Sequence, residues 1–436
     1  MKKKNSSGSA INDSSYSVAG AAFKGLNAIN PEGAYELAKK YQARTYIDDA
    51  HGLGVIGVGG DFSVIDGDER SHVAAIDAAT GLVSSWNPGT DGTVWSILAP
   101  GNSIYLGGSF SFAGGKPRAN LAEIGGIVDV ATDFNPSSNG AVFALAAGST
   151  FIYAGGSFSL IGADNRLGLA QIDRNSGAAT PWRADADGTV DALAVDSSTL
   201  YVGGDFSMIG GQQRSRIAKV YTADGQVTLW NPGCNARVSS ILLSSTAVYV
   251  AGLYFDTVAG VTRHSLAAIS PLTGMATNWD PNCDGGVYAL VQYGSSIFAG
   301  GGYSRVGGQN RASLAELDVS SGAATSWAPE LDQDAFSLAS NGSRLYVGGN
   351  FSRVGNSARF GFAGFDLSAG GEGEGEGEGE GEGEGGGEGE GEGEGEGEGE
   401  GEGEGEGEGE GEGEGEGEGE GEGEGEGEGE GEGEGE

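Results

Sequence analysis

Short runs of apolar residues, rich in β-branched and aromatic side chains, recur along most of the chain and are separated by Gly, Asn, Asp and Ser. Runs of this length and composition predict β-strands. In one representative stretch the predicted strands are Val190–Val195, Leu200–Phe206, Arg216–Tyr221 and Gln226–Trp230. After position 58 no window of about ten or more residues shows the 3.6-residue period of an amphipathic helix. The body of the chain is therefore predicted to be all-β.

Three columns of residues recur in one register. The first is an aromatic residue on the predicted fourth strand, at spacings of 48 or 49: Trp86, Phe134, Trp182, Trp230, Trp279 and Trp327. The second is an aromatic residue two positions after a Gly-Gly doublet, which reads Ala251-Gly252 in one copy: Phe62, Phe110, Phe158, Phe206, Tyr254, Tyr303 and Phe351. The third is an arginine: Arg70, Arg118, Arg166, Arg214, Arg263, Arg311 and Arg359. A fixed period of this length indicates a repeat architecture.

Four antiparallel strands per unit of about 45–50 residues are typical of a β-propeller. The number of blades is less clear from the pattern. Second and third strands occur seven times, whereas only six first strands are marked, by Val94, Val142, Val190, Val238, Val287 and Ala335. We favour seven blades closed partly by terminal strands, and the alternative is six blades with two surplus strands.

The three columns have structural roles that need no ligand. A Gly doublet at the end of the second strand permits a bulge or a close approach between blades. The aromatic columns supply bulk for the layer between neighbouring blades. The arginine is expected to stack on an aromatic ring or to bind carbonyls in the loop before the third strand, and the alternative is a ring of anion-binding arginines.

The repeat unit resembles known propeller repeats. It shares with kelch repeats the Gly-Gly doublet that ends the second strand and the Trp of the fourth. It is still more similar to the bacterial delta-60 type repeats, through Leu200–Phe206, Arg214, Ile217-Ala218 and Trp230-Asn231-Pro232. The resemblance covers about Val58 to Leu367. It implies a propeller of large, often exported or surface-associated bacterial proteins without a known catalytic role, and the kelch likeness implies a protein-binding disc.

Before Val58 the pattern is different. Pro31–Lys40 is predicted to form a short helix and Arg44–Ala50 a strand. Residues 34–57 (AYELAKKYQARTYIDDAHGLGVIG) resemble a piece of the α-oxoamine synthases, which are pyridoxal phosphate-dependent acyltransferases. The resemblance implies that Asp48 holds the pyridine nitrogen of the cofactor protonated and that His51 approaches the ring hydroxyl.

The Schiff-base lysine that this family places some thirty residues later has no counterpart, because Val58 to Gly89 contains no Lys. We therefore interpret the segment as an inactive relic or fusion. Subtracting one repeat of 48 residues from Val94–Ala99 places the missing first strand of the first blade at Tyr46–His51. Our hypothesis is that the borrowed strand fills this innermost position.

The composition separates the body from the end of the chain. From residue 371 to 436 Gly and Glu alternate, apart from Gly386, and this segment holds 34 of the 87 Gly and 32 of the 63 acidic residues. We expect a disordered, solvated tail that acts as a spacer or solubilising segment. Positions 1–370 hold the other 31 acidic residues against 23 Lys and Arg, so their net charge is −8 rather than the −40 of the whole chain.

Several classes of partner are disfavoured. The body is mildly acidic and has no basic cluster beyond Lys2–Lys4, so nucleic-acid binding is not expected. No run approaches 18 apolar residues, so no membrane span is predicted. The polar stretch Asn5–Ala10 follows the basic start, so no signal peptide is seen. We expect a monomer.

Few residues suggest chemistry. Cys234 and Cys283 occupy equivalent turns in adjacent blades, and whether they pair is open. The sequence Asp185-Ala186-Asp187-Gly188 has the look of a calcium loop but lacks its bidentate Glu, so a turn is the preferred interpretation. His51, His72 and His264 form no recognisable catalytic arrangement.

These observations predict three segments: an N-terminal segment at 1–57 that is partly α-oxoamine-synthase-like, propeller repeats at 58–368, and the Gly-Glu tail at 369–436. We predict a non-catalytic propeller that binds a protein or glycan through its loop faces, with no catalytic or metal-ligating residues and no cofactor. The alternative is a pyridoxal phosphate-dependent acyltransferase relic that uses Asp48 and His51.

Overall fold

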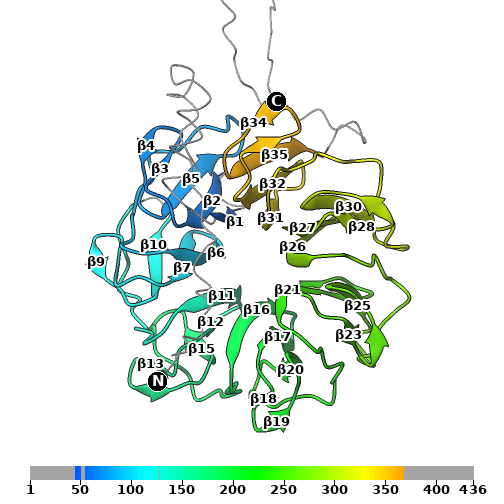
Figure 1. Cartoon of the computed structure of the whole chain (residues 1–436). Helices are drawn as coiled ribbons and strands as arrows, with labels where there is room; N and C mark the ends of the chain where they lie inside the picture. Colours follow the sequence, from blue (N-terminus) through cyan, green and yellow to red (C-terminus); the bar gives the residue numbers. More distant parts are fainter. Residues whose placement is uncertain (1–44, 51–54, 127, 368–436) are drawn as a thin grey trace, which may run out of the picture. The chain divides into compact units, whose positions relative to one another are not determined.

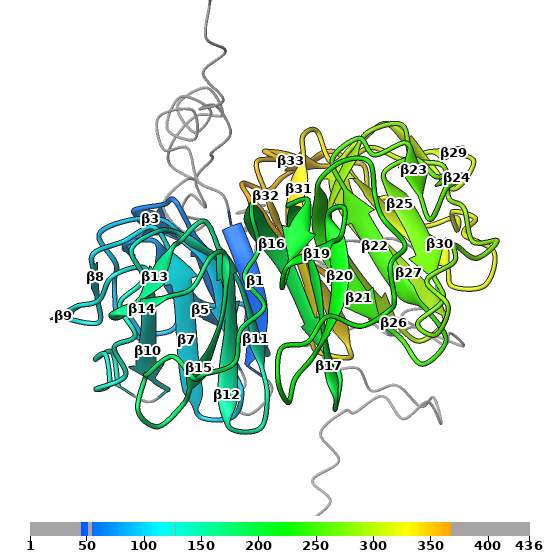
Figure 2. The ribbon, with the colours of Figure 1, turned by 90° about the horizontal axis from the view of Figure 1, so that it is seen from below.

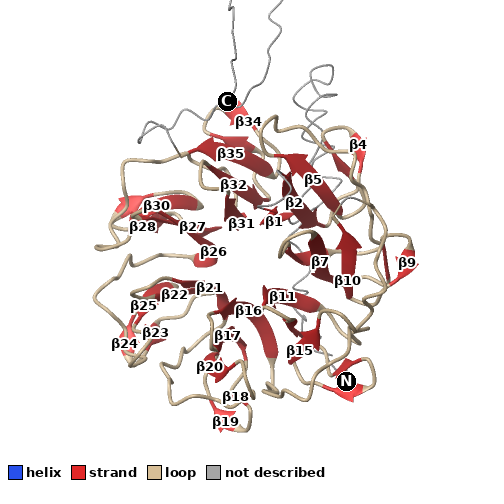
Figure 3. Cartoon of the chain, turned by 180° about the vertical axis from the view of Figure 1, so that it is seen from behind, coloured by secondary structure: helices blue, strands red, loops and turns tan. Residues whose placement is uncertain are grey.

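The computed structural model describes residues 45–50, 55–126 and 128–367, and every regular element in these ranges is a β-strand. Figure 3 shows this arrangement, with strands joined only by loops and turns. The all-β prediction is therefore confirmed. The predicted helix at Pro31–Lys40, His51 and the Gly-Glu tail lie outside the described residues.

The described strands form seven antiparallel sheets of three strands, here numbered in chain order and each given from its inner to its outer strand. Sheets 1 to 3 are β1 (Thr45–Ala50), β2 (Val55–Gly60), β5 (Val73–Asp77); β6 (Val94–Leu98), β7 (Ser103–Gly108), β10 (Leu121–Gly125); and β11 (Val142–Ala147), β12 (Phe151–Gly156), β15 (Leu169–Asp173). Sheets 4 and 5 are β16 (Thr189–Val195), β17 (Thr199–Asp205), β20 (Ile217–Tyr221); and β21 (Val238–Leu243), β22 (Val248–Gly252), β25 (Leu266–Ile269). Sheets 6 and 7 are β26 (Gly286–Tyr293), β27 (Ser296–Gly302), β30 (Leu314–Asp318); and β31 (Ala335–Ser340), β32 (Arg344–Gly349), β35 (Phe362–Asp366).

The sheets are arranged as the blades of a propeller. Each inner strand lies against the inner strands of the two neighbouring sheets, and β1 lies against both β6 and β31, so the ring is closed (Figure 1). Figure 2 shows the same sheets side-on, with the strands of each sheet stacked outward. The fold class is thus a β-propeller. The preference for seven blades stays a prediction, and the described residues hold seven sheets.

Two details differ from the predicted strands. In six of the seven described units the fourth strand is reduced to one bridge: Ile76↔Val83, Ile124↔Ala131, Ile172↔Ala179, Val220↔Val227, Ile269↔Ala276 and Leu317↔Ala324. A two-stranded hairpin, which the pattern did not predict, stands between the second and third strands of each sheet. The hairpins are β3 (Val64–Ile65) with β4 (Asp68–Glu69), β8 (Phe112–Ala113) with β9 (Lys116–Pro117), β13 (Leu160–Ile161) with β14 (Asp164–Asn165), β18 (Met208–Ile209) with β19 (Gln212–Gln213), β23 (Thr257–Val258) with β24 (Val261–Thr262), β28 (Arg305–Val306) with β29 (Gln309–Asn310), and β33 (Arg353–Val354) with β34 (Ser357–Ala358).

The core lies between the sheets. Seven clusters of buried apolar side chains are described, and each joins one sheet to the next. Both aromatic columns contribute to them, so the predicted role as inter-blade bulk is confirmed. Within sheet 4, for example, Tyr201 meets the edge of Trp230 at 5.4 Å between ring centroids, and Trp230 Nε1 donates to Ser270 O of the next sheet at 2.9 Å.

The fifth copy of the aromatic column needs a correction. Tyr254 is 64% exposed, whereas Phe255 is fully buried and packs against Gly252 as Phe110 packs against Gly108. The backbone N–H of Ser265 donates to Phe255 O, just as Asn120 donates to Phe110 O. One residue is therefore inserted before Phe255, and Phe255, rather than Tyr254, belongs to the column.

The two glycines of the doublet have different roles. A Cβ on the first, such as Gly203, would lie 2.7 Å from Val238 Cγ1 of the next sheet, so this glycine permits the close approach of the sheets. A Cβ on the second, Gly204, would lie 2.1 Å from Thr189 O of its own sheet. That contact is at the bulge where the register shifts between Val190 and Ala192. Both predicted uses of the doublet are confirmed.

The strand predicted at Arg44–Ala50 is present as β1 at Thr45–Ala50 and takes the innermost position of sheet 1. It has no bulge, because Thr45 pairs with Gly60 and Tyr46 with Gly59 without a shift. In sheet 2, by contrast, the register shifts between Val94 and Ser96. By pairing, Thr45 corresponds to Val94 and Tyr46 to Ser96, so counting back by 48 places the strand one residue late before the bulge and two residues late after it.

The compact unit that contains the sheets is Met1–Gly377, and a second unit comprises Glu378–Glu436. Within the described residues no helix is long and apolar enough to cross a membrane. The segment boundaries at 57 and 368 stay predictions.

Candidate functional site

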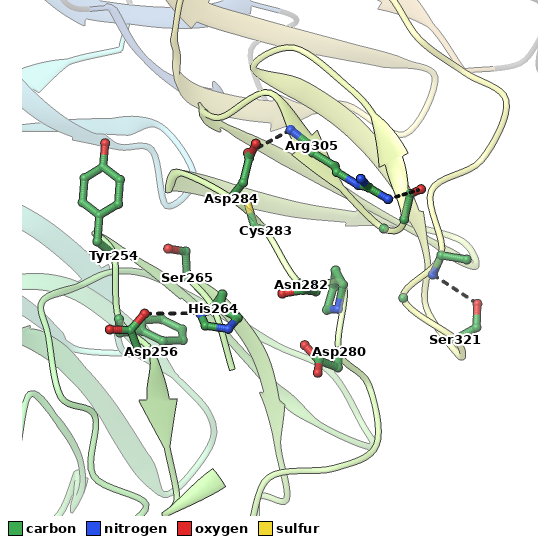
Figure 4. A pocket seen from close by; sticks show the side chains of 16 residues that line it. Tyr254, Asp256, His264, Ser265, Asp280, Asn282, Cys283, Asp284, Arg305 and Ser321 are labelled. Atoms are coloured by element: carbon green, nitrogen blue, oxygen red, sulfur yellow. Dashed lines mark hydrogen bonds and ion pairs between the residues drawn. The ribbon is translucent and has the colours of Figure 1, made fainter. Parts of the chain in front are cut away.

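A pocket of about 850 Å³ opens between sheets 5 and 6. Loops from both sheets line it: the turn after β22, the turn before β25, the connection from the fifth unit to β26, the start of hairpin β28–β29, and the turn after β30. Figure 4 shows the side chains that line it. Three of them depart from what the repeat places at the same positions, Tyr254, Asp256 and His264, and a fourth, Arg305, is matched only by Arg353 of sheet 7.

Tyr254 is the inserted residue on the rim of the pocket. Its backbone is left-handed, with φ of 54°, which is uncommon for a residue with a bulky side chain. Figure 4 shows its ring pointing away from Asp256 and His264. An exposed aromatic ring held on a strained backbone is a feature that occurs at binding sites, where the surrounding structure holds the strain.

Asp256 and His264 face each other inside the pocket, with 3.2 Å between Asp256 Oδ1 and His264 Nδ1. The position of Asp256 is Ser in the other six units: Ser63, Ser111, Ser159, Ser207, Ser304 and Ser352. The position of His264 is Ser71, Ala119, Leu167, Ser215, Ala312 and Phe360 in the others. The side chain of Asp256 is 70% exposed and that of His264 is 42% exposed, so their pairing stabilises the fold little and leaves them available to a ligand.

Asp284 and Arg305 form the opposite wall. Asp284 accepts hydrogen bonds from the backbone N–H groups of Ser304 and Arg305 at 2.9 and 2.8 Å. Partial burial acts to raise the pKa of Asp284, but these bonds and that from Ser304 Oγ outweigh it and hold the pKa below its ordinary value. The same brace recurs at Asp91, Asp187 and Asp332, so Asp284 is structural. Arg305 stands where Phe112, Leu160 and Met208 stand in other units, and sheet 7 also has an arginine, Arg353, at this position.

The two cysteines are free and buried in different inter-sheet clusters. Cys283 lines the pocket floor, and burial raises its pKa to about 12, while burial raises the pKa of Cys234 to about 11. Neither thiol is activated as a nucleophile, because the thiolate is the reactive form. The open question of pairing is thus answered: they do not pair in this structure.

The calcium-like sequence is a turn. Asp187 accepts from Ser207 and Met208 N–H, each at 2.8 Å, and Asp185 accepts from the guanidinium of Arg183. These carboxylates are used within the fold. Among the described residues no three His, Cys, Asp or Glu side chains gather as metal ligands.

The arginine column braces each unit. Six of its members donate Nη1 to the carbonyl of the preceding residue and Nη2 to a carbonyl fourteen residues later, two residues before the fourth-strand aromatic residue: Arg70, Arg118, Arg166, Arg214, Arg263 and Arg311. The predicted carbonyl-binding role is therefore observed, and these guanidinium groups are directed to the backbone rather than to an anion.

The residues of the enzyme alternative are not brought into a site by the described structure. Asp48 lies on β1, paired with Gly57, and His51 lies outside the described residues. Lys116 and Lys219 are the lysines of the described part. Lys116 lies on β9 close to Asp133, and Lys219 lies on β20 of sheet 4 and covers the ring of Tyr201. Neither of these lysines lies on β1, the strand that carries Asp48.

Comparisons with known proteins agree with the fold. Residues 199–227 match a family model described as "Domain of unknown function (DUF5122) beta-propeller". No curated protein matches this chain. A solved chain from a structure titled "Crystal Structure of Mitotic Checkpoint Complex" is similar, with a TM-score of 0.51 and 16% identity over 73% of this chain and 89% of that chain. A designed protein, Ika8, aligns with a TM-score of 0.46 and 12% identity over 71% of this chain and 94% of that chain. The chain is a β-propeller repeat protein.

Proposed function

We propose that this propeller is a non-catalytic interaction module that binds a protein or glycan partner on the loop face around the pocket between sheets 5 and 6. One observation carries the proposal. The pocket is the place where the repeat is broken by an inserted, exposed Tyr254 and by Asp256 and His264, which stand at positions that are Ser, Ala, Leu or Phe in the other units.

The chemistry of the lining suits a polar partner. Tyr254 offers a flat ring with a hydroxyl group, which suits the face of a sugar ring or a peptide side chain. Asp256 offers an acceptor, His264 offers a ring nitrogen, and Arg305 offers donors from the opposite wall. A concave site with a few convergent polar groups is the usual form of a recognition site.

The test compares capture by the full chain with capture by a pocket variant in which the repeat residues are restored, Asp256→Ser with His264→Ala. Both residues occur at these positions in other units, so the fold tolerates them. The matched control is Tyr221→Ala, which removes an exposed tyrosine from sheet 4. A glycan array and a quantitative pull-down should each be run with all three proteins.

The proposal predicts a glycan or protein whose capture falls at least about tenfold with the pocket variant and not with the control, which corresponds to about 1.4 kcal/mol of binding free energy. A set of partners that all three proteins capture equally would overturn it. The acidic tail should be absent from a second set of baits, because diffuse attraction of basic proteins by its charge would otherwise be counted as binding.

The enzyme alternative has its own test. Mixing the full chain with pyridoxal phosphate should give no visible absorption band near ~420 nm. Borohydride should trap no adduct within residues 34–57, because a Schiff base requires a suitably placed lysine. A trapped, stoichiometric adduct would contradict the non-catalytic proposal.

A further inference from the structure

In six of the seven sheets a fourth segment lies on the outer edge of the third strand, and one residue of it is clamped on both sides. Its N–H donates to a carbonyl of the third strand, as Thr325 N–H donates to Glu316 O at 3.0 Å. Its own C=O accepts from the arginine column, as Thr325 O accepts from Arg311 Nη2. The clamped residue is always Thr or Ser: Ser84, Thr132, Thr180, Thr228, Thr277 and Thr325.

The residue before the clamped one is always small and apolar: Val83, Ala131, Ala179, Val227, Ala276 and Ala324. It makes the single bridge to the third strand. The chain itself therefore contains six examples of the segment that this edge accepts, namely Ala or Val followed by Thr or Ser in extended conformation.

Sheet 7 has a groove of about 270 Å³ at the same place. Ala363, Gly364 and Phe365 of β35 form one wall and Gly355 of hairpin β33–β34 another. In sheet 6 the residues that correspond to Phe365 and Gly355 are Leu317 and Gly307, and the fourth segment lies between them. Leu317 forms the bridge to Ala324, and Ala324 N–H donates to Gly307 O at 3.0 Å. Pro329 completes the groove.

The two clamping groups are present in this groove. Gly364 corresponds to Glu316, and Arg359 to Arg311. Arg359 donates Nη1 to Ala358 O at 2.9 Å, as its six counterparts do to their preceding residues. Within the described part of the chain its Nη2 has no acceptor, whereas each counterpart's Nη2 binds the clamped Thr or Ser.

In six sheets the fourth segment supplies an aromatic residue to the core between sheets. In sheet 7, Phe360 and Phe362 supply aromatic side chains instead. Phe360 and Phe362 pack into the cluster between sheets 7 and 1, against residues such as Val58 and Ile76. The other units have Val, Leu or Ile where Phe362 stands. A segment bound in the groove of sheet 7 therefore needs no aromatic residue of its own.

We propose that the outer edge of β35 and this groove form a docking site for an extended segment of a partner protein, in which Ala or Val is followed by Thr or Ser. The segment adds a strand to sheet 7, its backbone clamped between Gly364 O and the Arg359 guanidinium. Strand addition of this kind obtains its affinity from main-chain hydrogen bonds and its selectivity from the side chains that face the sheet. This site is separate from the pocket between sheets 5 and 6.

The probe is a fluorescent peptide with the sequence of residues 320–326, Ser-Ser-Gly-Ala-Ala-Thr-Ser, titrated against the full chain. We expect saturable binding that weakens at least about tenfold for Arg359→Ala, since a hydrogen bond to a charged group is lost. The matched control is Arg353→Ala on the same hairpin, an exposed arginine that donates to Asn356 O and does not line the groove. Circular dichroism should show that both variants are folded.

A second probe changes the ligand instead of the protein. Methylation of the peptide nitrogen of the Thr removes the N–H that Gly364 O accepts, and we expect binding to weaken at least about tenfold. Equal affinity of the methylated peptide, equal effects of Arg359→Ala and Arg353→Ala, or no saturable binding would each overturn the proposal. Binding that occurs only after removal of residues 371–436 would overturn it as well, since the chain's own downstream segment would then take the groove.

Discussion

The two glycines of a doublet make different demands on space. The methyl of Gly203→Ala would meet a valine side chain, which can shift, whereas that of Gly204→Ala would meet a backbone carbonyl. Sheet 5 already has Ala251 at the first position, and every second position in the described sheets is Gly. We expect Gly203→Ala to cost about 1 kcal/mol and Gly204→Ala about 3 kcal/mol or more. Urea unfolding of both variants measures this, and a reversed order would contradict the assignment.

The two buried thiols make the stability of the folded protein depend on pH. The folded chain keeps the protons of Cys234 and Cys283 up to a pH of about 11 to 12, whereas an unfolded thiol loses its proton near about 8.5. The contribution of the thiols to stability is complete below about pH 8.5 and is lost as the pH rises above it.

At pH 10 the loss should be about 2 kcal/mol per thiol relative to pH 8. The double variant Cys234→Ala with Cys283→Ala should not show this loss of stability. Ala186, which stands at the equivalent position of another unit, shows that the position accepts alanine. Unfolding by urea at the two pH values compares parent and double variant. An equal loss in both proteins would mean that other groups, such as the buried tyrosines, cause the decline.

At the scale of elements, the fourth-strand aromatic residue ties each sheet to the next. Trp230→Phe keeps a ring against Tyr201 but loses the bond from Nε1 to Ser270 O, so we expect a loss of about 1 kcal/mol. Trp230→Ala should cost about 3–5 kcal/mol because a cavity remains between the sheets. Phe134 already occupies this position in sheet 2. If Phe and Ala cost the same, ring packing is not what holds the sheets together.

The sequence pattern predicted elements that recur and missed those that do not. Strands such as β17 were predicted almost to the residue, because period and turn signals repeat in every unit. The two-residue hairpins such as β18–β19 are too short to show a period of two. Tyr254 was placed in the aromatic column because Tyr254 and Phe255 are adjacent and either keeps the register; only burial separates them.

The pocket lay beyond prediction for a related reason. Its wall residues Asp256, His264 and Arg305 come from separate loops, and their proximity depends on how two sheets pack. One signal was present in the sequence: Asp256 stands in a column that is otherwise Ser. A residue that departs from an otherwise uniform column is a residue type that the fold itself does not require at that position.

At the scale of the molecule, the ring is closed by a strand that lacks the sequence of the repeat. β1 pairs with β2 and lies against β6 and β31, so its removal would open the inner edge of sheet 1. Comparing deletion of residues 1–54 with deletion of 1–44 isolates β1 with its connection to β2. We expect the longer deletion to lower Tm by at least about 5 °C more. Equal Tm values would show that β1 does not close the ring.

One set of structural rules builds every described sheet, and we propose that the binding site lies where these rules are broken. The most direct test is a variant that restores the rules: deletion of Tyr254, which recovers the spacing of the other units, together with Asp256→Ser and His264→Ala. Stability and affinity for the captured partner should be measured on the same protein.

We predict that this variant is as stable as the parent or more stable, by about 1 kcal/mol, because a strained left-handed backbone is removed. It also predicts that affinity for the partner falls at least about tenfold. A variant that is clearly destabilised yet binds its partner unchanged would contradict the claim, since Tyr254, Asp256 and His264 would then serve the fold and not the site.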